Sequence, residues 1–277
     1  MQPNFESLAP QYAKWFDSMH VTRKSEIERT ADRLIKLIPI YKDVEAETGV
    51  PAVWLAPINE RESSSNFSTY LGNGDPLSRK TIHVPAGRGP FFGERAWRDG
   101  ACDALHLDHI DRVKDTIGWT VESKMYEDEL WNGFGPRFRG RVTGYLMAGT
   151  DIYTGGKYIA DGVWSPSAID TQLGTVPMYC ALVERDPSLA LPRYGVMVKS
   201  DTPSVPDSRP DFIRDASILQ ADLNKLVPGE NLIIDGSIGR MTRLAIKHFQ
   251  EKHGLDVDGI VGDETTRAIQ SALQELH

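Results

Sequence analysis

The stretch Pro51-Ala-Val-Trp54-Leu55-Ala-Pro57-Ile58-Asn-Glu-Arg-Glu62, followed by Ser63-Ser-Ser-Asn66-Phe67, decides the fold. Its apolar first half predicts a short buried helix with Pro51 in the first turn, where a missing backbone N–H costs little. Glu62 stands four residues after Ile58, so the helical period places both side chains toward the core. A partly desolvated carboxyl group there is suited to act as a general acid, although a surface charge at the helix end explains the same letters. Pro57 predicts a kink or an early end of the helix.

A second carboxylate, Asp75, follows thirteen residues later in the turn sequence Asn73-Gly-Asp-Pro76. Asn, Gly and Pro favour tight turns, and β-branched and aromatic residues stand on both sides, at 69–71 and 80–84. The sequence therefore predicts a small β-hairpin that carries Asp75 and, six residues on, Thr81. Asp75 by itself would only shape the turn, but together with Glu62 it would form an acid/base pair.

The order Glu62, Asp75, Thr81 resembles the Glu, Asp, Thr arrangement of phage-type lysozymes. The letters Glu62-Ser-Ser and Asn66-Phe67 also resemble the Glu-Ser motif of soluble lytic transglycosylases, and the match spans residues 25–165. The resemblance implies a mainly α fold, with a lysozyme-like α+β catalytic domain and a small β-hairpin. It implies that Glu62 protonates the glycosidic oxygen between N-acetylmuramic acid and N-acetylglucosamine, while Asp75 and Thr81 position water. The gap between Glu62 and Asp75 is longer than in the common phage lysozymes.

Aromatic residues further along the chain are candidates for sugar binding. A helix over 121–130 ends in Trp131-Asn132-Gly133, which resembles the aromatic-Asn-Gly segment that lines the sugar cleft of these enzymes. An Asn side chain offers a donor and an acceptor to an N-acetyl group, although a helix C-cap requires the same letters. Tyr126 on this helix and Tyr158, within the aromatic-rich stretch 145–164, complete the predicted substrate-binding set with Trp131 and Asn132.

Prolines among Ser and Asp residues divide the chain. We expect a catalytic domain over 1–198, a Pro-rich linker over 199–215 and a second domain over 216–277. The last of these contains an internal repeat, Asp235-Gly-Ser-Ile-Gly-Arg-Met-Thr242 and Asp258-Gly-Ile-Val-Gly-Asp-Glu-Thr265. In each copy, Asp-Gly predicts a turn and Thr lies near the start of the next helix. The repeat closely resembles the small three-helix peptidoglycan-binding domain found at the ends of many wall hydrolases.

Composition and charge limit the partners. A net charge of −8 and a pI near 5.4 argue against nucleic acid as the main partner. No apolar run is long enough to predict a membrane span, and the first residues lack the pattern of a signal peptide. We therefore expect a monomer that is made in a host cytoplasm, reaches the wall through a holin-like pore and binds bacterial peptidoglycan. The reaction requires no metal or organic cofactor.

Three kinds of function stay open. The first is an endolysin that lyses the host cell as a muramidase, a glycoside hydrolase of the lysozyme kind, with a lytic transglycosylase giving 1,6-anhydro products as its close alternative. The second is a wall amidase or peptidase, which would need zinc on His83, His106 or His109, or Cys180 as a nucleophile; neither motif is complete. The third is an inactive wall-binding structural protein, which the loss of Glu62 would have favoured.

Overall fold

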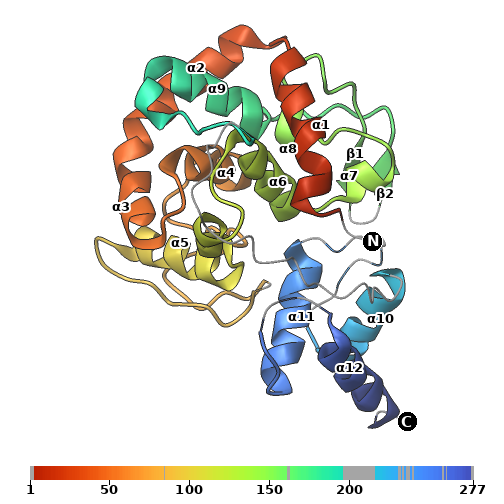
Figure 1. Ribbon diagram of the computed structural model, residues 1–277. Coiled ribbons are helices and arrows are strands. Elements are labelled where there is room, and N and C mark those ends of the chain that lie inside the picture. The colour runs from red at the N-terminus through yellow and green to blue at the C-terminus, as the bar shows by residue number, and fades with distance from the viewer. Residues whose placement is uncertain are drawn as a thin grey trace.

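The computed structural model describes residues 3–83, 85–160, 163–195, 216–229, 232, 234, 238, 240–257, 259 and 261–275. The expected domain boundary at 198 and the linker over 199–215 lie outside these residues. Within them, the chain is mostly helical and forms two apolar cores, one in a larger N-terminal domain and one in a smaller C-terminal domain (Figure 1). None of the described helices is long and apolar enough to cross a membrane.

The larger domain contains nine described α-helices. They are α1 (Phe5–Ser18), α2 (Lys24–Leu34), α3 (Ile38–Thr48), α4 (Ala52–Ser63), α5 (Ala96–Leu107), α6 (Val121–Asn132), α7 (Gly135–Phe138), α8 (Gly144–Met147) and α9 (Thr175–Arg185). Short 3₁₀ helices cover Ile35–Leu37, Ile110–Asp115 and Pro187–Leu189. The smaller domain contains α10 (Ala216–Leu226), α11 (Arg240–Lys252) and α12 (Asp263–Glu275).

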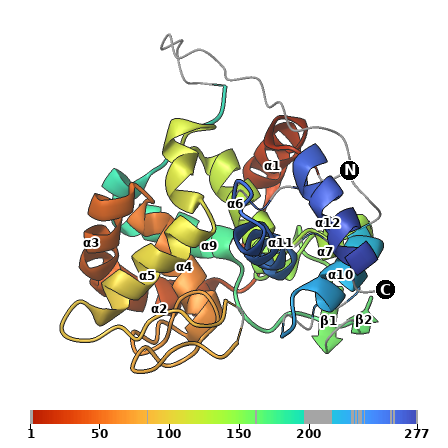
Figure 2. The same ribbon diagram turned by 90° about the horizontal axis from the view of Figure 1, so that it is seen from below.

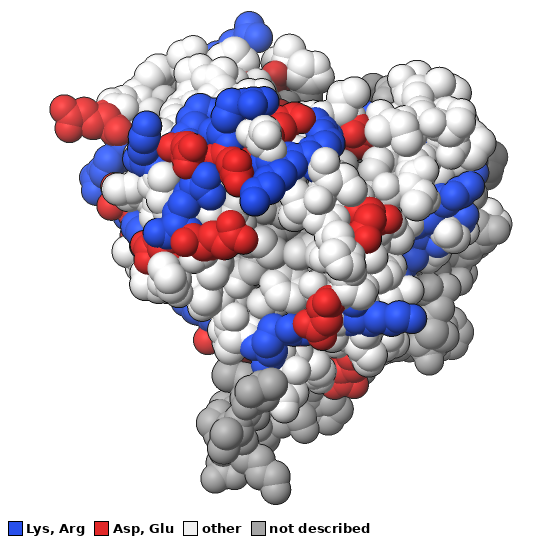
Figure 3. Space-filling model, turned by 90° about the horizontal axis from the view of Figure 1, so that it is seen from above, with Lys and Arg blue, Asp and Glu red and all other residues white. Residues whose placement is uncertain are grey.

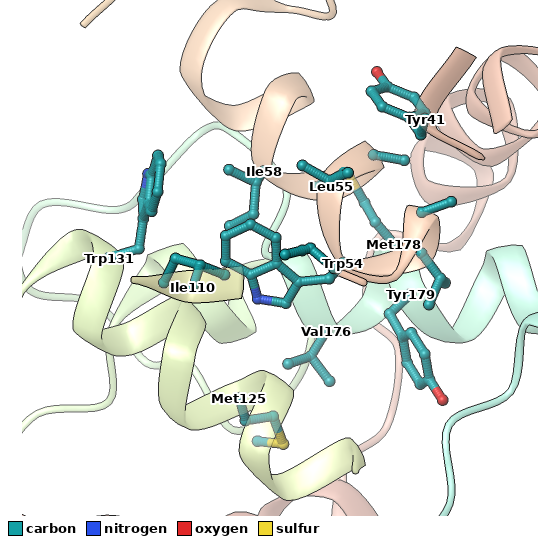
Figure 4. Close-up of a cluster of buried hydrophobic side chains, with 14 of the residues drawn as sticks. Tyr41, Trp54, Leu55, Ile58, Ile110, Met125, Trp131, Val176, Met178 and Tyr179 are labelled. Atoms are coloured by element: carbon teal, nitrogen blue, oxygen red, sulfur yellow. The ribbon is translucent and has the colours of Figure 1, made fainter. Parts of the chain in front are cut away.

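Helix α4 runs through the core of the larger domain. Every residue from Ala52 to Asn59 is buried, so its apolar side chains point in all directions and do not form a single stripe. Trp54 packs edge-on against Trp131 of α6, with ring centroids 5.7 Å apart. Figure 4 shows Trp54 among apolar side chains from α4, α6, α9 and the 3₁₀ helix at Ile110. This packing keeps α4 helical beyond Pro57 as far as Ser63.

Helix α6 is almost completely buried, although five of its buried residues carry charge. The Lys124 ammonium lies 2.5 Å from a carboxylate oxygen of Asp128, and Glu129 accepts hydrogen bonds from Tyr12 and Arg137. A buried charge is tolerated only with a partner of this kind. A capping box of Thr120 and Ser123 starts the helix. Its sequence therefore predicts a helix correctly, but not that its charged side chains lie inside the protein.

The predicted fold class is confirmed, but the predicted position of the β-hairpin was wrong. The antiparallel hairpin consists of β1 (Lys157–Ala160) and β2 (Val163–Ser165). Around Asp75 the described residues form turns with one isolated bridge, between Thr69 and Pro76. The Asp75 carboxylate accepts two of the following backbone N–H groups, which a second strand would need for pairing.

The smaller domain packs α10, α11 and α12 around Leu219, Leu223, Phe249 and Ile269. Each threonine of the repeat is the third residue of its helix, as predicted. Each also accepts a hydrogen bond from a glutamine amide on the preceding helix, Gln220 to Thr242 at 3.2 Å and Gln250 to Thr265 at 3.1 Å. The repeated residues Asp235 and Asp258 lie outside the described residues.

The two domains touch at the corner after α5, and both views place α11 beside the larger domain (Figures 1 and 2). His109 Nε2 lies 3.0 Å from the carbonyl oxygen of Val257, and the Lys247 ammonium donates to the carbonyl of Leu107. On the face shown in Figure 3, acidic and basic side chains lie next to one another. The ion pair of Arg185 with Asp32, for example, joins α9 to α2.

Candidate active site

Glu62 lies in the last turn of α4, where the helix leaves the core. Its side chain is exposed, so the predicted desolvation was wrong. The reason is that burial of α4 ends at Asn59, and the helical period carries no information about where a helix emerges from its core. Glu62 Oε1 accepts two hydrogen bonds, from the indole N–H of Trp131 at 3.0 Å and from the hydroxyl of Tyr145 at 2.7 Å. Among the described residues, none donates to Oε2.

The two donors give the oxygens of Glu62 different roles. An indole N–H can only donate. Burial, reinforced by the neighbouring Glu62 charge, raises the pKa of Tyr145 well above its ordinary value, so the phenol keeps its proton and donates as well. Because Oε1 already accepts two hydrogen bonds, the proton of a neutral Glu62 would reside on Oε2, the oxygen that accepts from none of the described residues.

A strained turn fixes the end of α4. Ser64 and Ser65 have φ values of 54° and 59°, a region that residues other than glycine rarely adopt. The turn is closed by hydrogen bonds from Ser64 N–H to the Glu60 carbonyl and from Ser65 N–H to the Asn59 carbonyl. The Ser65 hydroxyl also donates to the Glu60 carboxylate at 2.7 Å. These bonds satisfy the last carbonyls of the helix and hold the backbone beside Glu62.

Asp75 and Thr81 have structural contacts of their own. Asp75 is only 4% exposed, and its carboxylate accepts the backbone N–H groups of Ile82 and His83, while His83 Nδ1 lies 2.8 Å away. Thr81 donates to the Pro85 carbonyl and accepts the N–H of Arg88, which closes a loop. Within the described part of the chain, no hydrogen bond joins either residue to Glu62. Their role in positioning water stays a prediction.

Asp75→Asn is expected to lower the free energy of unfolding at pH 7 by about 1–3 kcal/mol, because an amide cannot accept the same set of donors. Burial raises the pKa of Asp75, but the N–H groups of His83 and Ile82 outweigh burial and hold that pKa below its ordinary value. The stabilisation is therefore present above the unfolded-state pKa of about 3.9 and is lost as pH falls through the lower folded-state value.

Urea unfolding at pH 7 and at about pH 3 would measure this difference, with the exposed Asp115→Asn as the matched control. We expect the gap between Asp75→Asn and the wild type to shrink at the lower pH and Asp115→Asn to match the wild type throughout. A gap of equal size at both values would contradict the assignment.

The predicted sugar-binding residues divide into two groups. Trp131 is 4% exposed and uses its ring to pack and its N–H to hold Glu62. Tyr126 is 3% exposed, packs on Phe5 and donates to the Pro3 carbonyl at 3.3 Å. Neither ring therefore has a face open for stacking on a sugar in this structure, which corrects the prediction. The aromatic residues of α6 are buried because the helix is enclosed on nearly all sides.

Asn132 and Tyr158 remain accessible. Asn132 is exposed at the end of α6, on the residue after Trp131. Tyr158 is half-buried on β1, where its ring meets Trp164 edge-on and Arg139 lies over both rings. Sequence reasoning did not single out Tyr145 as a partner of Glu62; its only signal was a place in the aromatic-rich stretch 145–164.

The sites needed for an amidase or peptidase are not found in the part of the chain that the structure describes. No group of three His, Cys, Asp or Glu side chains there could hold a metal ion. His83 lies against Asp75 and His109 against a backbone carbonyl. Burial raises the pKa of Cys180 to about 12, which disfavours the thiolate that a nucleophile requires.

Comparison with known proteins identifies the class of the smaller domain. Residues 214–269 match the family model described as a putative peptidoglycan binding domain. The match supports peptidoglycan as a partner and association with the cell wall. The matched residues include α10 and α11 and the larger part of α12.

The chain also has a weak likeness to one curated protein. It shares 26% identity over 150 residues with (-)-kolavenyl diphosphate synthase TPS10, chloroplastic, from Tripterygium wilfordii. That alignment covers 51% of this chain but only 17% of the synthase, so the activity in the name stays with that enzyme. No solved structure matches the chain.

Gln250→Ala is expected to weaken both the smaller domain and its retention on cell walls. The Gln250 side chain is 1% exposed, donates to Thr265 and accepts the N–H of Gly259 at 2.8 Å. Its removal leaves two buried polar groups without this partner, at a cost of about 1–3 kcal/mol for each. Calorimetry and co-sedimentation with purified walls would measure both effects. The exposed Gln270→Ala is the matched control, and equal behaviour of the two variants would contradict the prediction.

Proposed function

We propose that the chain is an endolysin that binds peptidoglycan through its smaller domain and cleaves the glycan with its larger domain. Glu62 is the general acid for the bond between N-acetylmuramic acid and N-acetylglucosamine. The observation that carries this proposal is the geometry of one carboxyl group that is exposed to solvent. Its Oε1 accepts hydrogen bonds from Trp131 and Tyr145, and Oε2 has no donor among the residues that the structure describes. The match of residues 214–269 to a peptidoglycan-binding family supports peptidoglycan as the substrate polymer.

The proton on Oε2 is transferred to the glycosidic oxygen as the bond from that oxygen to C1 of muramic acid breaks. The charge left on Glu62 is stabilised by the two donors at Oε1. The carboxylate then takes the proton of the nucleophile that adds to C1, which restores the acid. Water as the nucleophile gives a reducing end, the product of a muramidase. The 6-hydroxyl of the same sugar gives a 1,6-anhydro end, the product of a lytic transglycosylase. Neither route needs a metal or an organic cofactor.

The environment of Asp75 favours the transglycosylase as the second candidate. In an inverting hydrolase, the second carboxylate activates a water molecule, and the two carboxyl groups lie about 6.5–9.5 Å apart to leave room for it. Asp75 is buried, and both of its oxygens have partners within its own loop. Attack by the 6-hydroxyl requires only Glu62, acting first as acid and then as base.

Mass spectrometry of purified peptidoglycan after digestion with the full chain tests the proposal. Muropeptides with reducing-end muramic acid would support a muramidase, and 1,6-anhydro ends would support the transglycosylase. After digestion for the same time with Glu62→Gln, either product should be at least about 100-fold less abundant. Released stem peptides with intact glycan strands would refute glycan cleavage. In an infected cell, we expect release from the cytoplasm through a holin-like pore.

A further inference from the structure

Arg61, the residue before Glu62, has a buried side chain that is fixed by several contacts. Its side chain is 7% exposed, and its guanidinium donates to Asp170 Oδ2 at 2.9 Å and to the Leu173 carbonyl at 3.1 Å. The guanidinium carbon lies 4.5 Å from the centroid of the Tyr145 ring. Arg61 therefore connects the loop that contains Asp170 with the ring whose hydroxyl holds Glu62.

Asp170 also supports the backbone that carries Tyr145. A Cβ atom added to Gly144 would lie 2.7 Å from Asp170 Cβ, so the start of α8 packs directly on Asp170. The second carboxylate oxygen accepts a hydrogen bond from Lys157, and the Asp170 N–H donates to the Tyr153 hydroxyl. Burial raises the pKa of Asp170, but Arg61 and Lys157 outweigh burial and hold that pKa below its usual value. Asp170 thus remains an anion between Arg61 and the backbone of α8.

We propose that Asp170 is a positioning residue for the Glu62 reaction, acting through Arg61 on Tyr145. By holding the guanidinium against the Tyr145 ring, Asp170 keeps the phenol hydroxyl on Oε1 and so leaves the acid proton on Oε2. This inference rests on the function proposed above and adds to it the group that orients the acid.

The proposal predicts where the effect of a substitution falls. If Tyr145 tilts, its hydroxyl no longer donates to Oε1. The two oxygens of the Glu62 carboxyl group then differ less, and the acid proton is no longer confined to Oε2. The substrate still binds, because neither Asp170 nor Arg61 is required to touch it. The loss therefore falls on kcat and leaves KM unchanged. A purely structural ion pair would lower the stability of the protein but would not depend on the Tyr145 hydroxyl.

A double-mutant cycle in the full chain separates these two roles. Tyr145→Phe, Asp170→Asn and the double variant are assayed on soluble glycan chains of alternating N-acetylglucosamine and N-acetylmuramic acid. Loss of one hydrogen bond to a charged group should lower kcat of Tyr145→Phe about 10- to 100-fold. Asp170→Asn should lower kcat about 10-fold through misplacement. The double variant should be no slower than Tyr145→Phe, because Asp170 acts through the hydroxyl that Tyr145→Phe removes.

Two further variants serve as a control and as a substitute for Asp170→Asn. Asp151→Asn replaces a surface aspartate that pairs with His20 and should leave kcat and KM unchanged. If Asp170→Asn does not fold, Arg61→Lys replaces it in the same cycle, because lysine keeps the charge but loses the planar fork and the stacking on Tyr145.

Each outcome supports or overturns the inference. A double variant whose kcat loss equals the product of the two single losses would overturn it, as would a loss that appears in KM alone. If Glu62→Gln retains activity, the proposed function fails and this inference fails with it. If Glu62→Gln is inactive and the cycle is multiplicative, only the role of Asp170 is refuted.

Discussion

Glu62→Gln is expected to lower the rate of peptidoglycan cleavage by about 10²- to 10⁴-fold, the usual contribution of a general acid. Glutamine has nearly the same volume, and its carbonyl oxygen can still accept from Trp131 and Tyr145 at the site of Oε1. The variant lacks only an acidic proton at the other position. We therefore expect the fold to be unchanged while the proton transfer is lost. Initial rates on purified walls, with circular dichroism of the same samples, would measure this.

Glu60→Gln is the matched control for that experiment. Glu60 lies in the same turn of α4 and pairs with Arg33 and Ser65, away from Trp131 and Tyr145. Its glutamine can still accept from Ser65, so we expect activity close to that of the wild type. If both variants lost activity equally, the effect would belong to the turn at Ser63–Ser65 and not to the acid.

Sequence patterns correctly predicted the features that depend on interactions between neighbouring residues. The apolar run from Trp54 to Ile58 is enough to specify a buried helix, and the serines after Glu62 are enough to end it. The threonines of the repeat lie near their helix starts for the same reason, because a helix start depends on neighbouring residues. These features depend on contacts within a few residues in sequence.

The features that were missed depend on residues far apart in the chain. Tyr145 reaches Glu62 across 83 positions, and Asp170 reaches Arg61 across 109. No periodicity in α4 contains that information. The hairpin prediction near Asp75 failed because turn residues and β-branched residues predict that the chain reverses there, but not which acceptors the backbone N–H groups bind. In the structure, the N–H groups of Ile82 and His83 donate to the Asp75 carboxylate. The Asp75 carboxylate, on a short side chain in the turn, is a closer acceptor for these N–H groups than the carbonyl groups of a second strand would be.

Asp128→Asn is expected to have the largest effect on stability, a loss of about 3–5 kcal/mol in the free energy of unfolding. The Lys124 and Asp128 side chains are 1% and 0% exposed, and the ammonium lies 2.5 Å from Oδ2. Thr175 donates to the same oxygen at 2.6 Å. Asparagine would leave a buried ammonium ion without its counter-charge. All six tryptophans precede residue 196, so fluorescence during urea unfolding follows the larger domain specifically.

The exposed pair of Lys24 and Glu28 provides the comparison, because it has the same spacing of four residues on a helix. Glu28→Gln should cost less than about 1 kcal/mol, since water solvates the lysine that remains. A similarly small loss for Asp128→Asn would show that water reaches Lys124 and would contradict the burial of α6.

The double variant Lys124→Met with Asp128→Leu distinguishes the cost of an unpaired charge from the value of the pair. Burial raises the pKa of Asp128 despite the opposing effects of Lys124 and Thr175, so ionising this carboxyl group inside the protein is itself unfavourable. Two apolar side chains of similar volume should therefore recover most of the stability that Asp128→Asn loses. If the double variant were as unstable as Asp128→Asn, the ion pair would itself stabilise the larger domain. In that case, the charged residues of α6 would stabilise its buried position as much as its apolar residues do.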